Sequence, residues 1–245
     1  MSLVASRLPS PEEISELPPD ELGLRLLRIV VDDQQGHLLS RSVVANPSYW
    51  ADEFGEAGTS DQFIESMTEA WDWLILNRLV AMKPGAASID GHAYVTRRGQ
   101  AAAADARAQA VLRAEARLDV DLHERLARRV RRQFLLGEYE SATFIAMREV
   151  EIRVRELAGY SHSDYGTSMV RNAFSPQDGP LRDPDQDRGE QEATSHLFAG
   201  AIGLFKNPSS HREVNFDDPA LASEVVLFAD LLLRMLDAIE ERLKP

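Results

Sequence analysis

The sequence predicts a mainly α-helical protein in two parts: an N-terminal domain with one small β-hairpin, and a C-terminal helical bundle. Apolar residues recur at helical spacing over residues 221–243, which keeps one face apolar for about six turns. Two short segments separated by turn residues, at 79–82 and 92–96, indicate the hairpin. The Ala- and Arg-rich stretch of residues 100–117 favours helix but has little apolar face. We therefore expect residues 106–118 to be a helical connector between the two domains.

The N-terminal domain, residues 20–105, is preceded by a proline-containing segment, residues 1–19, which we expect to be an extended leader. The first helix of the domain is predicted to begin at Pro18-Pro19-Asp20-Glu21, since proline and acidic residues suit the first turn of a helix. Its apolar pattern ends at Asp32. A second amphipathic helix is predicted from about Ser60 to Asn77.

Turn residues and a helix cap define the region that follows. Pro84-Gly85 and Asp90-Gly91 mark the turns of the hairpin, and Thr96 is a suitable N-cap for a helix that begins near Arg97. Two helices followed by a hairpin and another helix resemble a winged helix-turn-helix domain, over about residues 20–105.

The charge of the second helix argues against DNA recognition by this domain. A helix that reads the major groove presents cationic or amide side chains to the bases. The predicted helix 60–77 instead exposes four acidic residues: Asp61, Glu65, Glu69 and Asp72. Arg97 and Arg98 are the obvious phosphate partners near the hairpin. We therefore interpret the domain as a protein-interaction or dimerisation module rather than a DNA reader.

The C-terminal domain, residues 119–245, is expected to be built from amphipathic helices. Four are predicted, at about 122–134, 139–157, 192–205 and 218–243. Residues 175–188 are rich in Pro, Asp, Gly and Arg, and we expect a mobile loop there.

A polar cluster, Lys206-Asn207-Pro208-Ser209-Ser210-His211, follows the third of these helices. Because Pro208 disfavours helix in the residue before it, the helix is expected to end at Lys206-Asn207. These residue types suit metal-independent phosphodiester cleavage. Histidine can act as general acid or base near neutral pH, lysine can stabilise charge on phosphate, and asparagine can bond a phosphate oxygen. The other interpretation of His211 is a side chain that caps the turn through a backbone carbonyl.

This cluster and the apolar segment before it, Leu197-Phe198-Ala199-Gly200-Ala201, together with the long closing helix, resemble the Ymh-type family of bacterial and phage proteins. That family is similar to the HEPN superfamily of helical bundles, commonly homodimers, many of which are metal-independent RNases in toxin–antitoxin and antiviral systems. The superfamily signature is an Arg, often followed by a polar residue, and then a His after four to six residues.

Lys206, Asn207 and His211 stand on the signature positions, so the resemblance implies that they are catalytic. Lys206 departs from the signature Arg and lacks the planar, two-pronged grip of a guanidinium on phosphate. The domain therefore either cleaves RNA less efficiently or binds RNA or a nucleotide without cutting it.

Further candidates lie on the first two helices of the bundle. The resemblance implies that Glu151 positions Lys206 or His211, whereas an ordinary surface ion pair with Arg155, one turn away, explains it equally well. A basic stripe that includes Arg125, Arg128 and Arg132 suits an RNA backbone. Arg155 and Arg212 complete the set of candidate RNA-binding residues. The stripe is also explained as a solvated face, or as a contact with the acidic N-terminal domain.

The composition limits the classes of function. With 27 Lys and Arg against 40 Asp and Glu, the net charge is −13, which disfavours tight nonspecific binding to nucleic acid. The chain has no cysteine, so it has no zinc–thiolate site, and no metal or other cofactor is predicted. No apolar run is long enough to cross a membrane, and we expect a cytoplasmic protein.

Three functions remain. The first is a metal-independent endoribonuclease or RNA-binding effector of the toxin or phage-defence type, acting as a homodimer, with an antitoxin or other protein as partner. The alternative is a non-catalytic regulatory or protein-interaction protein with a winged-helix domain. The third is a structural helical dimer that binds no ligand.

Overall fold

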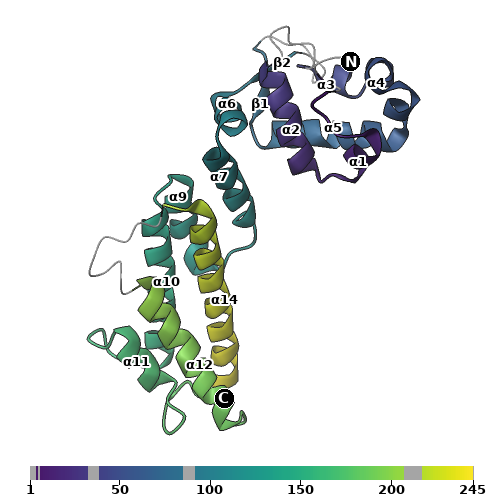
Figure 1. The fold of residues 1–245 in the computed structure, drawn as a ribbon. Helices are drawn as coiled ribbons and strands as arrows, with labels where there is room; N and C mark the ends of the chain where they lie inside the picture. Colours follow the sequence, from purple (N-terminus) through teal and green to yellow (C-terminus); the bar gives the residue numbers. More distant parts are fainter. Residues whose placement is uncertain (1–3, 5, 33–38, 85–91, 207–216, 245) are drawn as a thin grey trace. The chain divides into compact units, whose positions relative to one another are not determined.

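The computed structural model describes residues 4, 6–32, 39–84, 92–206 and 217–244 (Figure 1). As predicted, the protein is mainly helical. It divides into two compact units, Met1–Gln109 (unit 1) and Ala110–Pro245 (unit 2). Each unit has its own buried core.

The core of unit 1 lies between two helices, α2 and α5, that pack against each other. Its largest fully buried side chains are Trp50, Phe63 and Trp71. A β-carbon at Gly23 of α2 would lie 2.7 Å from the Trp73 ring on α5, so a residue without a side chain allows this close approach. The helices of unit 1 are α1 (Pro11–Glu16), α2 (Pro19–Asp32), α3 (Arg41–Val44), α4 (Pro47–Phe54), the 3₁₀-helix η1 (Gly55–Thr59), α5 (Asp61–Leu76) and α6 (Arg97–Ala104).

The β-hairpin is confirmed. Strand β1 (Val80–Met82) pairs antiparallel with β2 (Ala93–Val95), and Ala81 lies opposite Tyr94. The predicted cap is also confirmed, because the Thr96 hydroxyl accepts a hydrogen bond from the Gly99 N–H at the start of α6.

The prediction of an extended leader over residues 1–19 is wrong for part of that segment. Ser10 caps helix α1 and forms a reciprocal capping box with Glu13, while Pro11 occupies the first helical position. The side chain of Ile14 is fully buried. Burial of this one apolar residue, together with the cap, makes a short helix favourable where the prolines alone suggested extended chain.

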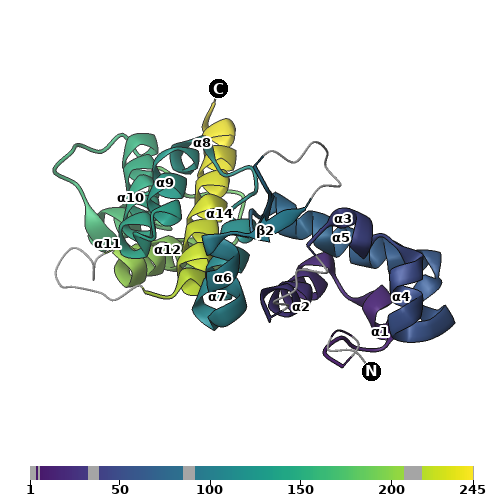
Figure 2. The ribbon, with the colours of Figure 1, turned by 90° about the horizontal axis from the view of Figure 1, so that it is seen from above.

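Unit 2 is a helical bundle centred on α10 and α14, which lie alongside each other (Figures 1 and 2). Ala142, Ala146 and Val150 of α10 and Leu233 and Leu236 of α14 are all fully buried in its core. The bundle contains α8 (Glu124–Ala127), α9 (Arg129–Leu135), α10 (Tyr139–Leu157), α11 (Gly166–Ala173), α12 (Arg188–Ala201), the π-helix η2 (Ile202–Lys206) and α14 (Pro219–Leu243).

Several boundaries differ from the prediction. The segment expected to be a helical connector, residues 106–118, does form a helix, α7 (Ala106–Arg117), but its Ala114 is fully buried in the core of unit 2. The helix predicted over 122–134 is divided at Arg128 into α8 and α9. Helix α12 begins at Arg188, earlier than predicted, because Asp187 forms a capping box with Glu190.

The loop over residues 175–188 is tied to the bundle. Leu181 is buried, and the Arg242 guanidinium donates hydrogen bonds of 3.0 Å and 3.1 Å to the carbonyls of Leu181 and Arg182. The composition of the segment had suggested a mobile loop. The hydrogen bonds that hold it come from α14, about 60 residues further along the chain, so the sequence of the loop itself could not reveal them.

Candidate functional site

The candidate site is at the C-terminal end of α12, where the helix widens into η2. A π-helical turn holds one more residue per hydrogen-bonded ring than an α-helical turn, and such turns are frequent at functional sites. The turn ends at Lys206, whose side chain is 14% exposed. Asn207, His211 and Arg212, the other predicted residues of this segment, lie outside the described residues.

Glu151 meets Lys206 in a buried ion pair. The Lys206 Nζ lies 3.2 Å from Glu151 Oε2, and the Glu151 side chain is 4% exposed. The second carboxylate oxygen, Oε1, accepts a hydrogen bond from the N–H of Gly166. The prediction that Glu151 lies near Lys206 is thus consistent with the geometry, and the pairing of Glu151 with Arg155 is not what the structure shows.

Gly166 explains how the Glu151 carboxylate is fixed. This residue begins α11 with φ of 74°, a left-handed conformation that glycine adopts readily. Its N–H therefore turns toward α10, where Glu151 accepts it. One carboxylate joins α10, α11 and η2, and it holds the ammonium group at the end of the π-helical turn.

Arg155 lies one turn further along α10 and makes a different contact. Its Nη1 donates a hydrogen bond of 3.5 Å to the carbonyl of Asp164. Nearby, burial and the carboxylates of Asp178 and Asp164 raise the pKa of Tyr160, so its phenol remains protonated at neutral pH. Arg155 is half-buried and supports the loop before α11 rather than standing out as a phosphate-binding side chain.

The predicted basic stripe divides into paired and unpaired arginines. Arg125 lies 2.6 Å from the Glu156 carboxylate and 3.8 Å from that of Glu149. Arg128 and Arg132 are exposed, and neither has an acidic partner within the described chain. Arg125 is therefore neutralised by α10, and only part of the stripe is available to a polyanion.

The stripe and the Lys206 site lie on different sides of α10. Glu149, which contacts Arg125, and Glu151, which contacts Lys206, are two positions apart on this helix. Successive α-helical residues are rotated by about 100°, so the two side chains leave the helix about 160° apart. Arg125 and Lys206 therefore approach α10 from different sides.

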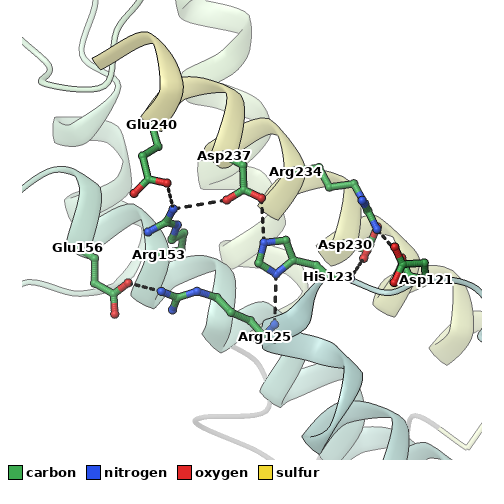
Figure 3. Close-up of polar contacts among 9 residues, drawn as sticks. All are labelled: Asp121, His123, Arg125, Arg153, Glu156, Asp230, Arg234, Asp237 and Glu240. Atoms are coloured by element: carbon green, nitrogen blue, oxygen red, sulfur yellow. Dashed lines mark hydrogen bonds and ion pairs between the residues drawn. The ribbon is translucent and has the colours of Figure 1, made fainter. Parts of the chain in front are cut away.

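A second polar cluster, which the sequence did not indicate, connects α8, α10 and α14 (Figure 3). The Arg153 guanidinium bonds Glu240 at 2.7 Å and Asp237 at 3.4 Å. His123 Nε2 lies 3.0 Å from Asp237, and the backbone N–H of His123 donates to Asp230. These partners are 84 to 114 residues apart in the chain, so no local pattern could reveal them.

Both ring nitrogens of His123 are used in this cluster. Nδ1 accepts the N–H of Arg125 at 3.2 Å and so caps α8, while Nε2 faces Asp237. Nδ1 must therefore be unprotonated, with the proton on Nε2. His123 is therefore a structural cap of α8.

Within the described part of the chain, no group of three or more His, Cys, Asp or Glu side chains is arranged to hold a metal ion. In the same residues, no helix is long and apolar enough to cross a membrane.

These observations define a helical bundle with a buried Lys–Glu pair at the end of η2, which follows α12. Residues 120–236, within unit 2, match a family described as "Protein of unknown function (Hypoth_ymh)". This part of the chain is therefore similar to the Ymh-type family. No curated protein and no solved structure matches the chain.

Proposed function

We propose that unit 2 is a HEPN-like domain that cleaves or binds RNA without a metal, through a site formed by Lys206, Glu151, Asn207 and His211. The observation that supports this most is the Lys206–Glu151 pair. A buried carboxylate that is also bonded to the Gly166 backbone holds a cation directly before the Asn207–His211 segment. A cation fixed in this way is positioned to face a phosphate.

In the proposed reaction, a ribose 2′-oxygen attacks the adjacent phosphorus and the bond to the 5′-oxygen breaks, which leaves a 2′,3′-cyclic phosphate and a 5′-hydroxyl. His211 removes the proton from the 2′-hydroxyl or supplies one to the leaving 5′-oxygen. Lys206 stabilises the charge that develops on the phosphate oxygens, and Asn207 bonds one of them. Glu151 is a positioning residue, because it contacts Lys206 and not the substrate.

The resemblance to HEPN proteins extends the proposal to assembly and setting. Two copies of the domain would form a homodimer, in which two sites face one cleft. The protein would act in the cytoplasm as a toxin or phage-defence effector, and an antitoxin would be a suitable partner.

Incubation of the purified protein with total RNA in excess EDTA tests the proposal. We expect cleavage products that carry a 2′,3′-cyclic phosphate, and we expect Lys206→Met and His211→Ala each to reduce the rate by at least about 100-fold. Lys244→Met is the matched control, because this exposed lysine pairs with Glu241 at the end of α14. If the wild-type protein neither cleaves RNA nor retains it, or if Lys206→Met behaves like Lys244→Met, the proposal is wrong.

A non-catalytic role is favoured by one observation in unit 1. Glu65 and Glu69 are exposed on α5, and Asp72 of the same helix is bonded to Arg41. We propose on this ground that unit 1, if it is a winged-helix domain, binds protein and not DNA. Retention of a specific DNA duplex by the full chain, at moderate salt and independently of His211, would contradict this part of the proposal.

A further inference from the structure

Unit 2 contains a cavity of about 260 Å³ between the loop that precedes α12, α12 itself and the C-terminal part of α14. Thr194 of α12 lines it, twelve positions before Lys206, which is about 18 Å of helix away from the proposed RNA site. Pockets that hold drug-sized ligands usually exceed about 300 Å³, so this volume suits a smaller molecule.

The cavity has an apolar wall and a polar rim. Phe174, Met235 and Ile239 provide the wall. Phe174 is held firmly, since its ring stacks on the buried Phe198 with centroids 4.6 Å apart. An apolar body of limited size would therefore meet a surface that is already ordered.

The rim carries one cation whose donors are hardly used. Arg182 lines the cavity and is half-buried, and its Nη1 makes a weak hydrogen bond of 3.4 Å to the carbonyl of Pro176. Within the described residues it has no carboxylate partner. A guanidinium has five N–H donors in a planar fork that matches a carboxylate, so the rim can bind a ligand carboxylate.

The opposite part of the rim is rich in acceptors. The Gln191 Nε2 donates both of its hydrogens, to the carbonyls of Asp183 at 2.7 Å and Gln186 at 2.9 Å. Its Oε1 therefore remains as an acceptor at the cavity, with no donor among the described residues. The Thr194 hydroxyl donates a hydrogen bond of 3.0 Å to the backbone carbonyl of Glu190, so its oxygen can still accept a hydrogen bond.

Asp183 adds a negative charge beside these acceptors. The N–H of Asp185 and the guanidinium of Arg242 lower the pKa of Asp183, so the carboxylate is ionised at neutral pH. Arg242, which also lines the cavity, pairs with this carboxylate, so a ligand ammonium group would share Asp183 with Arg242 and would meet the oxygen acceptors of Gln191 and Thr194 beside it.

We propose that this cavity binds a free α-amino acid with an apolar side chain. The side chain lies against Phe174, Met235 and Ile239, the carboxylate on Arg182, and the ammonium group among Gln191, Thr194 and Asp183. The assignment is independent of the RNA proposal, since none of these residues belongs to the Lys206 site.

Isothermal titration calorimetry of the full chain with L-phenylalanine and L-leucine tests the proposal. We expect saturable binding of at least one of them. Phenylalaninamide lacks the carboxylate, N-acetylphenylalanine lacks the ammonium group, and glycine lacks the side chain. Each is expected to bind at least about tenfold more weakly, the factor that corresponds to one charge-assisted hydrogen bond. The dipeptides Gly-Phe and Phe-Gly distinguish a chain end from a free amino acid, and equal binding of either dipeptide contradicts the proposal.

Variants assign the site. Arg182→Gln is expected to weaken binding at least about tenfold, while Arg171→Gln, a change to an exposed arginine of α11, leaves it unchanged. Circular dichroism shows whether each variant is folded. If Arg182→Gln unfolds the domain, Thr194→Val is the second variant, because valine conserves the shape of threonine, and it is also expected to weaken binding. The proposal is overturned if neither amino acid binds at about 10 mM, a concentration at which even a millimolar site would be nearly saturated. It is also overturned if neither folded variant weakens binding.

Discussion

Removal of the Glu151 carboxylate should destabilise unit 2 strongly. The Glu151→Ala variant would lose the ion pair with Lys206 and would leave the Gly166 N–H without its acceptor. Breaking a fully buried ion pair from one side costs about 3–5 kcal/mol. Since the Lys206 side chain keeps 14% of its exposure, part of its charge can be rehydrated, and we expect the lower value, about 3 kcal/mol.

Urea denaturation measures this loss of stability in unit 2, and unit 1 of the same molecule serves as the control. Trp50, Trp71 and Trp73 are the only tryptophans of the chain, and all three are in unit 1. Tryptophan fluorescence therefore follows unit 1, whereas far-ultraviolet circular dichroism follows the helices of both units. We expect the fluorescence transition to stay in place and a part of the dichroism transition to move to lower urea concentration.

A double-mutant cycle separates the ion pair from other effects of the substitution. Lys206→Met leaves a buried carboxylate without its cation, so it should also destabilise unit 2, by about 3 kcal/mol. Once one partner is absent, removal of the other costs less, and we expect a coupling energy of about 2 kcal/mol. A Glu151→Ala change below about 0.5 kcal/mol, or a coupling energy near zero, would refute the reasoning.

Three further predictions concern sites remote from that pair. A β-carbon at Gly99 would lie 2.1 Å from a backbone oxygen, so Gly99→Ala should destabilise unit 1 by at least about 2 kcal/mol, measured by tryptophan fluorescence in urea. The buried Trp50 indole donates a 2.7 Å hydrogen bond to a backbone carbonyl, so Trp50→Phe should lower the free energy of unfolding of unit 1 by about 2 kcal/mol. Trp73 is less buried, so Trp73→Phe should lower it less, and urea denaturation followed by circular dichroism measures both changes. The backbone N–H of Asp185 and the Arg242 guanidinium lower the pKa of Asp183 in the folded protein. The ionised Asp183 carboxylate therefore stabilises the fold at pH values above its pKa in the unfolded chain, and this stabilisation is lost as the pH falls through its lower pKa in the folded protein. Asp183→Asn should therefore make the unfolding midpoint of unit 2 less dependent on pH below about pH 4, and an unchanged dependence would contradict this.

Local patterns were sufficient to predict most of the long helices. Helix α5 was predicted closely because Ser60 caps it and one face is apolar through Leu74. The hairpin was predicted because turn residues and alternation act over only a few positions. Helix α1 was missed, since its stability depends on burial of Ile14 by residues distant in the sequence.

The candidate site was predictable only in part. Pro208 suggested where α12 would end, but nothing in the local sequence indicated η2, which packs against α10 and α11. The contact between Glu151 and Lys206 spans 55 positions, and it came from a resemblance rather than from spacing. Helix α11, which supplies the Gly166 N–H, was not predicted at all, because its eight residues span only about two helical turns, too few for an apolar spacing to repeat.

The charges of unit 2 bear on the choice between an enzyme with a small site and a protein that binds long RNA. A long RNA footprint needs many unpaired cations, since each neutralised phosphate adds to the salt dependence of binding. Arg125, Arg131 and Arg153 are already paired with carboxylates, whereas Arg128 and Arg132 are exposed and have no carboxylate partner among the described residues. The paired arginines of the predicted stripe therefore do not supply cations for a continuous RNA path to Lys206. If RNA is the substrate, the protein should recognise one or two nucleotides at the cleavage point, and its affinity should depend only weakly on salt. A steep salt dependence would instead indicate that Arg128 and Arg132 carry the binding and that Lys206 does not contact the RNA.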